Sequence, residues 1–168
     1  MIPISSAWHE KRETKIGDFG ETLIREHFEQ NGCICYKPVT NGAHLFDFLM
    51  LMPDKKTIAV EVKTKPSRTK YPDTGFNFNQ YNGYKNFADE HNIPIFIFFV
   101  DENKNAIYGN FLHELDKSRI SNGFLYPFEE KTRFGQTIIY FPLNAMLLVR
   151  FLTSYEIAEL KRLRGDYS

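Results

Sequence analysis

The hydrophobic pattern of residues 14–31 has the three- and four-residue spacing of a helix that buries one face. Thr14 stands where a helix cap is expected, and Gly32 follows the end of the pattern. Gly17 and Gly20 lie on or beside the apolar stripe, so we expect this helix to approach a sheet closely. The stripe consists of Ile16, Gly20, Leu23, Ile24, His27 and Phe28.

Three short runs with strand character follow this helix, and turn residues separate them. The first turn is expected around Asn41 and Gly42, and the second over residues 53–56. Short turns join neighbouring antiparallel strands, so the three runs predict a meander or part of one. They read ICYKPV, HLFDFLMLM and TIAVEVKTK.

The next part of the chain adds a loop over residues 67–75 and a second helix over residues 79–91. Tyr81, Tyr84 and Phe87 have helical spacing in this second helix, and we interpret them as packing residues. The run PIFIFFVD that follows is apolar at almost every position, which is typical of a strand covered on both faces. Such a strand can run parallel to one of the earlier strands.

The remaining chain predicts strands in AIYGNFL and TIIYFPL and a helix over residues 153–164, capped by Thr153 or Ser154. The order of elements indicates an α/β protein, with a mixed β-sheet flanked by helices. We expect one domain over residues 1–168. Its core lies in residues 14–101, and an extension over residues 102–168 completes the sheet and ends in the helix.

Composition narrows the class of protein further. A chain of 168 residues that is 42% hydrophobic can bury one core, and it contains no apolar run of about 18 residues that could span a membrane. Cys33 and Cys35 fall short of the four ligands of a structural zinc site. We therefore expect a soluble, cytoplasmic protein. Its net charge of zero favours no partner.

The candidate chemistry lies on either side of the second turn. Asp47 interrupts an apolar run, and a buried carboxylate is costly unless it is paired or binds a metal. Glu61 and Lys63 share one face of the next strand, and Asp47 and Glu61 are equidistant from the turn. Two such carboxylates suit Mg²⁺ or Mn²⁺, with Lys63 acting on a phosphate. The alternative is a buried salt bridge between Asp47 and Lys63.

Three segments with this order resemble the PD-(D/E)XK nuclease superfamily, which has a restriction-endonuclease-like fold, and within it the branch of the archaeal Holliday junction resolvases. The resemblance covers residues 14–101, and Phe46 stands where the superfamily name has proline. It implies a core of one helix, a three-strand meander, a second helix and a strand. The segments are KIGDFGETLIREHFEQNGCICYKPVTNG, DFLMLMPDKKTIAVEVKTK and NQYNGYKNFADEHNIPIFIFF.

The resemblance also implies a ligand set for a divalent metal. Asp47 and Glu61 would bind Mg²⁺ or Mn²⁺, and the main-chain carbonyl of Val62 is a further candidate ligand. Glu21, on the first helix, would reach the metal through water or help to bind a second ion. The alternative for Glu21 is a solvated helix carboxylate.

Two more residues complete the site that the resemblance implies. Lys63 would act on the attacking water or the scissile phosphate. Gln80 would orient Lys63 or contact the DNA backbone, and an ordinary surface amide is the alternative. The implied activity is that of a metal-dependent DNA endonuclease, with junction cleavage as one of several open specificities. An inactive nuclease-fold module that binds nucleic acid or a protein is the main alternative, and an RNA substrate is another.

A basic cluster follows the candidate site along the chain. Lys65, Arg68 and Lys70 could contact the backbone of duplex or branched DNA, although a solvated charged loop also explains them. Many relatives of this superfamily are homodimers, because two cuts need two active sites. The resemblance therefore implies a homodimer.

Overall fold

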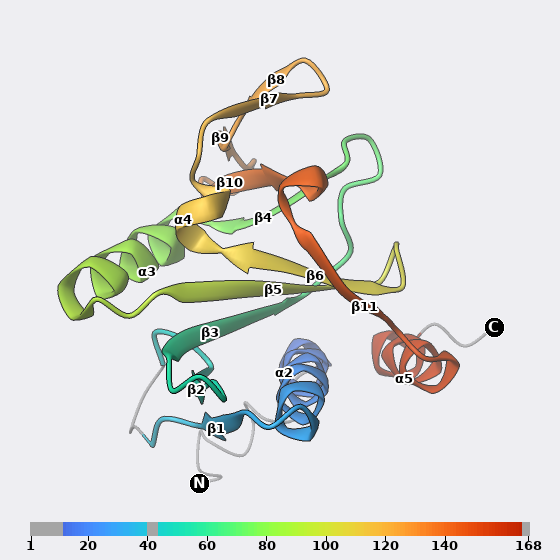
Figure 1. Cartoon of the computed structure of the whole chain (residues 1–168). Helices are drawn as coiled ribbons and strands as arrows, with labels where there is room; N and C mark the ends of the chain where they lie inside the picture. Colours follow the sequence, from blue (N-terminus) through green and yellow to red (C-terminus); the bar gives the residue numbers. More distant parts are fainter. Residues whose placement is uncertain (1–11, 40–43, 166–168) are drawn as a thin grey trace, which may run out of the picture.

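In the computed structural model, residues 12–39 and 44–165 are described, and their helices and strands form three layers (Figure 1). The turn expected around Asn41 and Gly42 lies outside these residues. The elements are α2 (Arg12–Gln30), β1 (Ile34–Tyr36), β2 (Phe48–Leu51), β3 (Thr57–Thr64), β4 (Asp73–Asn77), α3 (Phe78–His91), β5 (Ile95–Asp101), β6 (Ala106–Phe111), α4 (Leu112–Leu115), β7 (Arg119–Ser121), β8 (Phe124–Tyr126), β9 (Phe128–Lys131), β10 (Thr137–Pro142), the 3-10 helix η1 (Leu143–Ala145), β11 (Leu147–Phe151) and α5 (Ser154–Arg164).

The central layer is a six-stranded sheet in the order β1-β2-β3-β5-β6-β11. β3 and β5 pair in parallel, and the other neighbours pair antiparallel. The sheet is therefore mixed, as predicted, and the first three strands form the expected meander. Every residue of β5 is buried, which confirms a strand covered on both faces.

Helices cover both faces of this sheet. Ile58, Val60 and Val62 of β3 pack in a core with residues of α2 and α5. Ala59 faces the opposite core, which contains Tyr84 of α3 and apolar residues of β4 and β10. The alternation predicted for β3 is confirmed, so Glu61 and Lys63 share the face of the sheet that α3 covers.

Two smaller sheets adjoin the α3 side. β4, β10 and β9 form one, and β7 pairs with β8 in a hairpin that projects at the top of Figure 1. The prediction of a loop over residues 67–75 was wrong from Asp73 onward, because β4 begins there. The polar residues and the glycine of this segment are typical of a loop, but the segment forms a strand because it pairs with β10.

The contact between α2 and the sheet is close at one glycine. A Cβ on Gly20 would lie 1.8 Å from the Oγ1 atom of Thr64, whereas nothing lies within 4 Å of the corresponding position on Gly17. The predicted close approach is therefore confirmed for Gly20 and wrong for Gly17. The helix also begins at Arg12, so Thr14 lies inside it and is not its cap.

The C-terminal helix has the predicted cap. Thr153 precedes α5, its hydroxyl accepts a hydrogen bond from the N–H of Glu156, and the side chain of Glu156 accepts one from the N–H of Thr153. This capping box satisfies two backbone donors that the helix itself leaves unpaired. None of the described helices is long and apolar enough to cross a membrane.

Candidate active site

The hairpin of β2 and β3 brings Asp47 next to Glu61. The register pairs Phe48 with Val60, and Asp47 precedes Phe48 just as Glu61 follows Val60. Asp47 lies in a bend just before β2, not inside the strand as predicted. Its N–H donates to the carbonyl of Val60 at 2.9 Å, one position out of the register of β2 and β3, so the regular pairing ends at Phe48. The negative charge of Glu61 still acts on Asp47, so the two carboxylates lie near one another.

Where the strand pairing ends, the side chain of Asp47 hydrogen-bonds to the backbone of β3 in place of a backbone group. Its Oδ2 atom accepts a hydrogen bond from the N–H of Val62 at 2.7 Å. The N–H and C=O of one residue in an antiparallel ladder point to the same edge. The carbonyl of Val62 therefore faces the edge of β3 at which Asp47 lies. A third oxygen ligand would need this position beside the two carboxylates.

The ammonium group of Lys63 is held by three side chains. Its Nζ atom lies 2.6 Å from Oε1 of Glu61, 3.0 Å from Oε1 of Gln80 and 3.3 Å from the hydroxyl oxygen of Tyr84. Gln80 and Tyr84 are four residues apart on α3, so both side chains lie on the same face of that helix. The helix therefore fixes Lys63 from above the sheet.

The charges around Asp47 are unbalanced. The pKa of Asp47 is raised to about 8, first by burial and then by the negative charges of Glu61 and Glu21, which together outweigh the hydrogen bond from Val62 and the charge of Lys63. Glu21 forms an ion pair with Lys37 at 2.6 Å. We call Glu21, Asp47 and Glu61 the carboxylate cluster; Asp47 is the member whose charge is least compensated.

The donor atoms of this site fit a hard divalent cation. In the described part of the chain no three His, Cys, Asp or Glu side chains are arranged as a ready metal site. Asp47 and Glu61 nevertheless offer carboxylate oxygens that repel one another, and the carbonyl of Val62 faces the same edge. Oxygen ligands of this kind suit Mg²⁺ or Mn²⁺, whose charge would relieve the repulsion.

The structure brings together the residues that the sequence singled out. Lys63 pairs with Glu61 and not with Asp47, so the alternative salt bridge is not formed. The buried hydroxyl of Tyr84 was missed, because its spacing indicated packing alone. Its four-residue separation from Gln80 was the available signal. Lys37, the partner of Glu21, carried no signal in the sequence.

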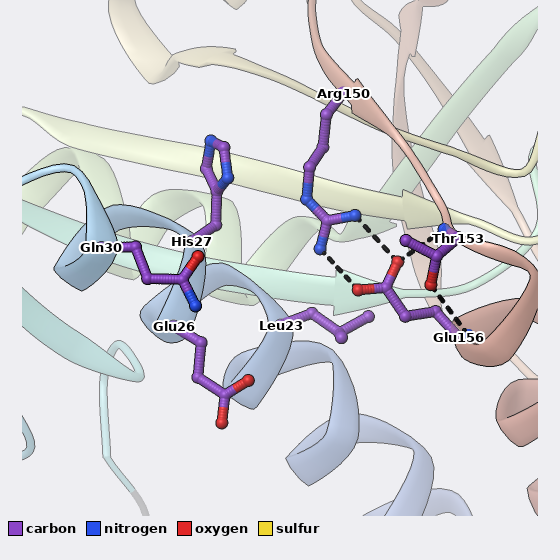
Figure 2. Close-up of a pocket in the computed structure, with 7 residues that line it drawn as sticks. All are labelled: Leu23, Glu26, His27, Gln30, Arg150, Thr153 and Glu156. Atoms are coloured by element: carbon purple, nitrogen blue, oxygen red, sulfur yellow. Dashed lines mark hydrogen bonds and ion pairs between the residues drawn. The ribbon is translucent and has the colours of Figure 1, made fainter.

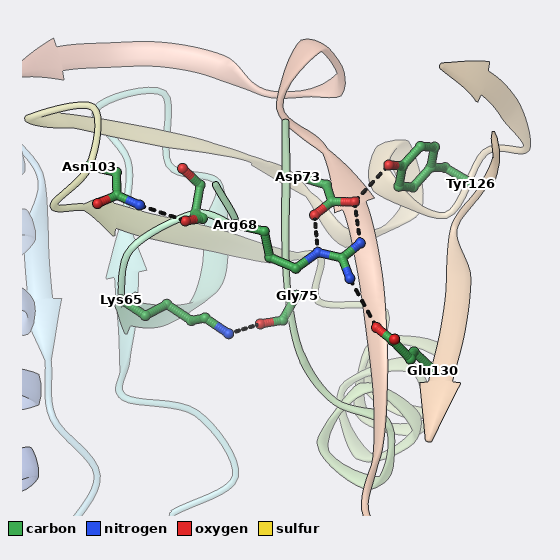
Figure 3. Close-up of polar contacts among 8 residues, drawn as sticks. Lys65, Arg68, Asp73, Gly75, Asn103, Tyr126 and Glu130 are labelled. Carbon is green, nitrogen blue, oxygen red and sulfur yellow. Dashed lines mark hydrogen bonds and ion pairs between the residues drawn. The ribbon is translucent and has the colours of Figure 1, made fainter. Parts of the chain in front are cut away.

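The basic cluster after β3 has partners within the protein. The Nζ atom of Lys65 donates to the carbonyl of Gly75 at 2.6 Å. Arg68 donates two hydrogen bonds to Asp73, at 2.6 and 2.7 Å, and pairs with Glu130 at 2.9 Å (Figure 3). These contacts favour a structural role for Lys65 and Arg68. Lys70 is exposed and is better placed to contact a phosphate.

A shallow pocket of about 300 Å³ lies on the other side of the sheet, between α2, β11 and the start of α5 (Figure 2). Arg150 points across it and donates two hydrogen bonds of 2.8 Å to Glu156. Burial, and then the charge of Arg150, lower the pKa of His27 in its wall. Because Arg150 and Glu156 satisfy one another, we interpret this pocket as part of the capping of α5.

The mixed sheet between two layers of helices, with Asp47 and Glu61 at the β2–β3 hairpin, is a fold that known nucleases also have. Its structure is similar to that of a Holliday junction resolvase from Archaeoglobus fulgidus, with a TM-score of 0.51 and 11% identity over 77% of this chain and 90% of that one. A nuclease from a fusselovirus aligns over 100% of this chain and 99% of that one, with a TM-score of 0.44 and 7% identity. No protein-family model matches the sequence, and no curated protein does so either.

Proposed function

We propose that this protein is a metal-dependent DNA endonuclease that hydrolyses phosphodiester bonds at the carboxylate cluster. The observation that carries the proposal is the group of contacts at the end of the β2–β3 hairpin. Asp47 accepts a hydrogen bond from the N–H of Val62 and is acted on by the charge of Glu61, and Lys63 pairs with Glu61. A nuclease-like fold with this arrangement supports phosphodiester hydrolysis over other reactions of two carboxylates and a lysine. We assign a nucleic-acid substrate because the fold is similar to that of a Holliday junction resolvase and because two carboxylates with a lysine suit phosphodiester hydrolysis.

The roles of the residues follow from their contacts. Asp47, Glu61 and the carbonyl of Val62 would hold Mg²⁺ or Mn²⁺, which when bound supplies Lewis-acid stabilisation of the phosphate. Lys63 donates hydrogen bonds to the attacking water or to a phosphate oxygen. Its ammonium group already has the required neighbours, because Glu61 pairs with it and Gln80 orients it.

Glu21 has the most distant role in this proposal. Its charge acts on Asp47, so it lies near the cluster, and it would reach the metal through water. At present it pairs with Lys37, whose side chain is 53% exposed and can move away. DNA, duplex or branched, is the proposed partner, and a homodimer in the cytoplasm would provide one active site for each of two cuts.

The test is cleavage of labelled substrates in Mg²⁺, Mn²⁺ or EDTA. A suitable panel contains linear duplex, single strand, flap, four-way junction and RNA, each incubated with the wild type and with Asp47→Ala. We expect metal-dependent cutting of at least one DNA substrate, lost in the variant. Binding without cutting in all metals would replace the proposal with a non-catalytic nucleic-acid-binding module, and cutting by Asp47→Ala at the wild-type rate would remove Asp47 from the site.

A further inference from the structure

The β7–β8 hairpin exposes an unusual amount of apolar surface. Ile120 is 79% exposed, Leu125 is 62% exposed and Phe124 is 41% exposed. Ile120 and Leu125 are directly paired across the hairpin and share one face, whereas Phe124 lies on the opposite face, beside the body of the protein. Exposed apolar groups that gather in one place mark an interaction surface more often than isolated ones do.

The aromatic rings behind Phe124 form a continuous row. Phe124 stacks on Phe128 with ring centroids 6.0 Å apart, and Phe128 stacks on Tyr140 at 5.2 Å. The ring of Tyr71 meets Phe124 edge-on at 5.1 Å, so the 65–72 loop contributes to the row. Phe124 lies near the exposed end of the row, where a further planar group could stack.

Basic side chains are interleaved with these rings. The guanidinium of Arg68 lies 3.8 Å from the ring centroid of Tyr140 and 4.8 Å from that of Tyr71. The ammonium of Lys70 lies 5.3 Å from the ring of Tyr71, on the exposed loop. Contacts of this kind between cations and rings are attractive. Because Asp73 and Glu130 pair with Arg68, the exposed positive charge beside the row is that of Lys70.

The hairpin is firmly attached to the segment that leaves the candidate active site. The hydroxyl of Tyr126 donates to Asp73 at 2.6 Å, and Asp73 is held in turn by Arg68 (Figure 3). Burial lowers the pKa of Lys65, and the positive charges of Lys63 and then Arg68 lower it further. Lys63, Lys65 and Arg68 therefore lie near one another and, together with Asp73, connect the candidate active site with the hairpin.

The charge balance of this region differs from that of the whole chain. Residues 65–75 and 117–135 contain seven basic and three acidic residues, whereas the complete chain has a net charge of zero. A positively charged region that presents aromatic rings is complementary to a polyanion with stacking groups. Single-stranded nucleic acid has this chemistry, and stacking on aromatic side chains does not depend on its sequence.

We propose that the β7–β8 hairpin and the 65–72 loop form a stacking platform that binds an unpaired nucleotide strand next to the cleavage site. The bases stack on Phe124 and Tyr71, and Lys70 contacts the phosphates. The inference rests on the proposed nuclease function, because it names the substrate as DNA with a single-stranded segment near the cut. A continuous duplex offers no exposed base face to the platform.

The experiment measures binding separately from cleavage. Fluorescence anisotropy of a labelled oligothymidylate, and of a duplex of equal length, is recorded in EDTA with the full chain. We expect Phe124→Ala to weaken binding of the single strand about tenfold and to leave duplex binding nearly unchanged. Phe124→Leu, which keeps apolar packing but lacks a ring, should lose nearly as much. Lys70→Ala should weaken binding of both probes and reduce the salt dependence.

A control variant and a second assay complete the design. Phe151→Ala removes a phenylalanine that is 65% exposed on β11, away from the platform, and should bind as the wild type does. With Mg²⁺, Phe124→Leu should lower the ratio of flap cleavage to duplex cleavage. Single-strand binding that resists both Phe124 variants would overturn the platform, as would a change from dimer to monomer in light scattering, which would make the patch a self-interface.

Failure of the nuclease proposal is visible separately. If no substrate is cut but the oligothymidylate binds and Phe124→Leu weakens its binding, the platform stands as a binding surface and the catalytic role is lost. If Asp47-dependent cutting occurs while both Phe124 variants bind and cut as the wild type does, the nuclease proposal is supported and the stacking platform is ruled out.

Discussion

Two clusters of buried charge lie close together along the chain, and they are built in opposite ways. In the first, Asp73 is fully buried and receives two hydrogen bonds from Arg68 and one from Tyr126. In the second, the carboxylate cluster, two acids repel a third and the pKa of Asp47 rises to about 8. The first cluster satisfies its charges and the second does not.

This difference distinguishes charge that stabilises the fold from charge that is kept for chemistry. A buried carboxylate with a complete set of donors costs little once it is formed, whereas one surrounded by other acids is destabilising until a proton or a cation arrives. Sites with strongly shifted pKa values are often functional sites. Substitutions in the two clusters should therefore affect different properties of the protein.

The largest expected effect is on stability, in the Arg68–Asp73 cluster. Arg68→Met would leave the carboxylate of Asp73 buried without its two-point partner, which costs about 3–5 kcal/mol in the free energy of unfolding. Urea denaturation followed by circular dichroism measures this. Arg162→Met, which breaks an exposed pair with Glu159, serves as the control and should cost less than about 1 kcal/mol. Equal losses of stability in Arg68→Met and Arg162→Met would show that the buried Arg68–Asp73 pair does not stabilise the fold more than an exposed pair does.

The next effect is on catalysis, in the carboxylate cluster. Lys63→Met should slow cleavage by about 10²- to 10³-fold, because it removes the group that stabilises charge on the phosphate or water. Its cost in stability should be smaller than that of Arg68→Met, since Glu61 and Asp47 can then share a proton. Single-turnover cleavage and urea denaturation of the same preparations check both statements. An active Lys63→Met variant would show that Lys63 only balances Glu61.

The pH dependence of stability should also distinguish the clusters. Because the pKa of Asp47 is raised from 3.8 to about 8, the folded state in EDTA holds one proton more than the unfolded state between these values. The free energy of unfolding should therefore fall as the pH rises from about 4 to about 8, and this fall should be smaller in Asp47→Asn. Parallel curves for both proteins would show that Asp47 titrates normally.

Metal addition extends the same test. At pH 8 Asp47 is partly ionised, so Mg²⁺ should bind the folded state and raise the unfolding midpoint of the wild type. Asp47→Asn has lost one ligand and should show little increase. Thermal unfolding with and without EDTA measures this difference, and Ca²⁺ can serve as a second hard cation. An equal shift in both proteins would place the metal elsewhere.

The smallest effects concern two buried tyrosine hydroxyls, one in each cluster. Tyr126→Phe removes a 2.6 Å hydrogen bond to Asp73 and should cost about 1.5–3 kcal/mol in stability without slowing cleavage at saturating duplex. Tyr84→Phe removes a neighbour of Lys63 and should slow cleavage about tenfold, with a stability change within about 1 kcal/mol. If Tyr126→Phe slowed cleavage and Tyr84→Phe lowered stability instead, the roles assigned to the two clusters would be reversed.

The sequence predicted the carboxylate cluster well because local rules determine it. Alternation places Glu61 and Lys63 on one face of β3, and a short turn pairs β2 with β3 so that Asp47 comes near Glu61. The central sheet follows from the same rules, together with the apolar run of β5. The bend at Asp47 shifts its N–H by one position, to the carbonyl of Val60, but its side chain still reaches the N–H of Val62.

The Arg68–Asp73 cluster could not be predicted in this way. Its partners are brought together by β9 and β10, and Tyr126 lies 53 positions from Asp73 along the chain. No periodicity relates residues at such separations, so Lys65 and Arg68 were indistinguishable from a solvated basic loop. The role of Tyr84 was missed for a related reason, because the residue packs in the core and contacts Lys63 at the same time.

The contact between Gly20 and Thr64 affects more than the packing of α2. Gly20 immediately precedes Glu21, and Thr64 immediately follows Lys63, so the contact joins the two segments that carry the active-site groups. The spacing between the helix that carries Glu21 and the strand that carries Glu61 is thus limited by a direct contact between the helix backbone and the side chain of Thr64. A larger residue at position 20 would have to displace Thr64 or the helix, and displacing the helix would move Glu21 relative to the carboxylates of the strands.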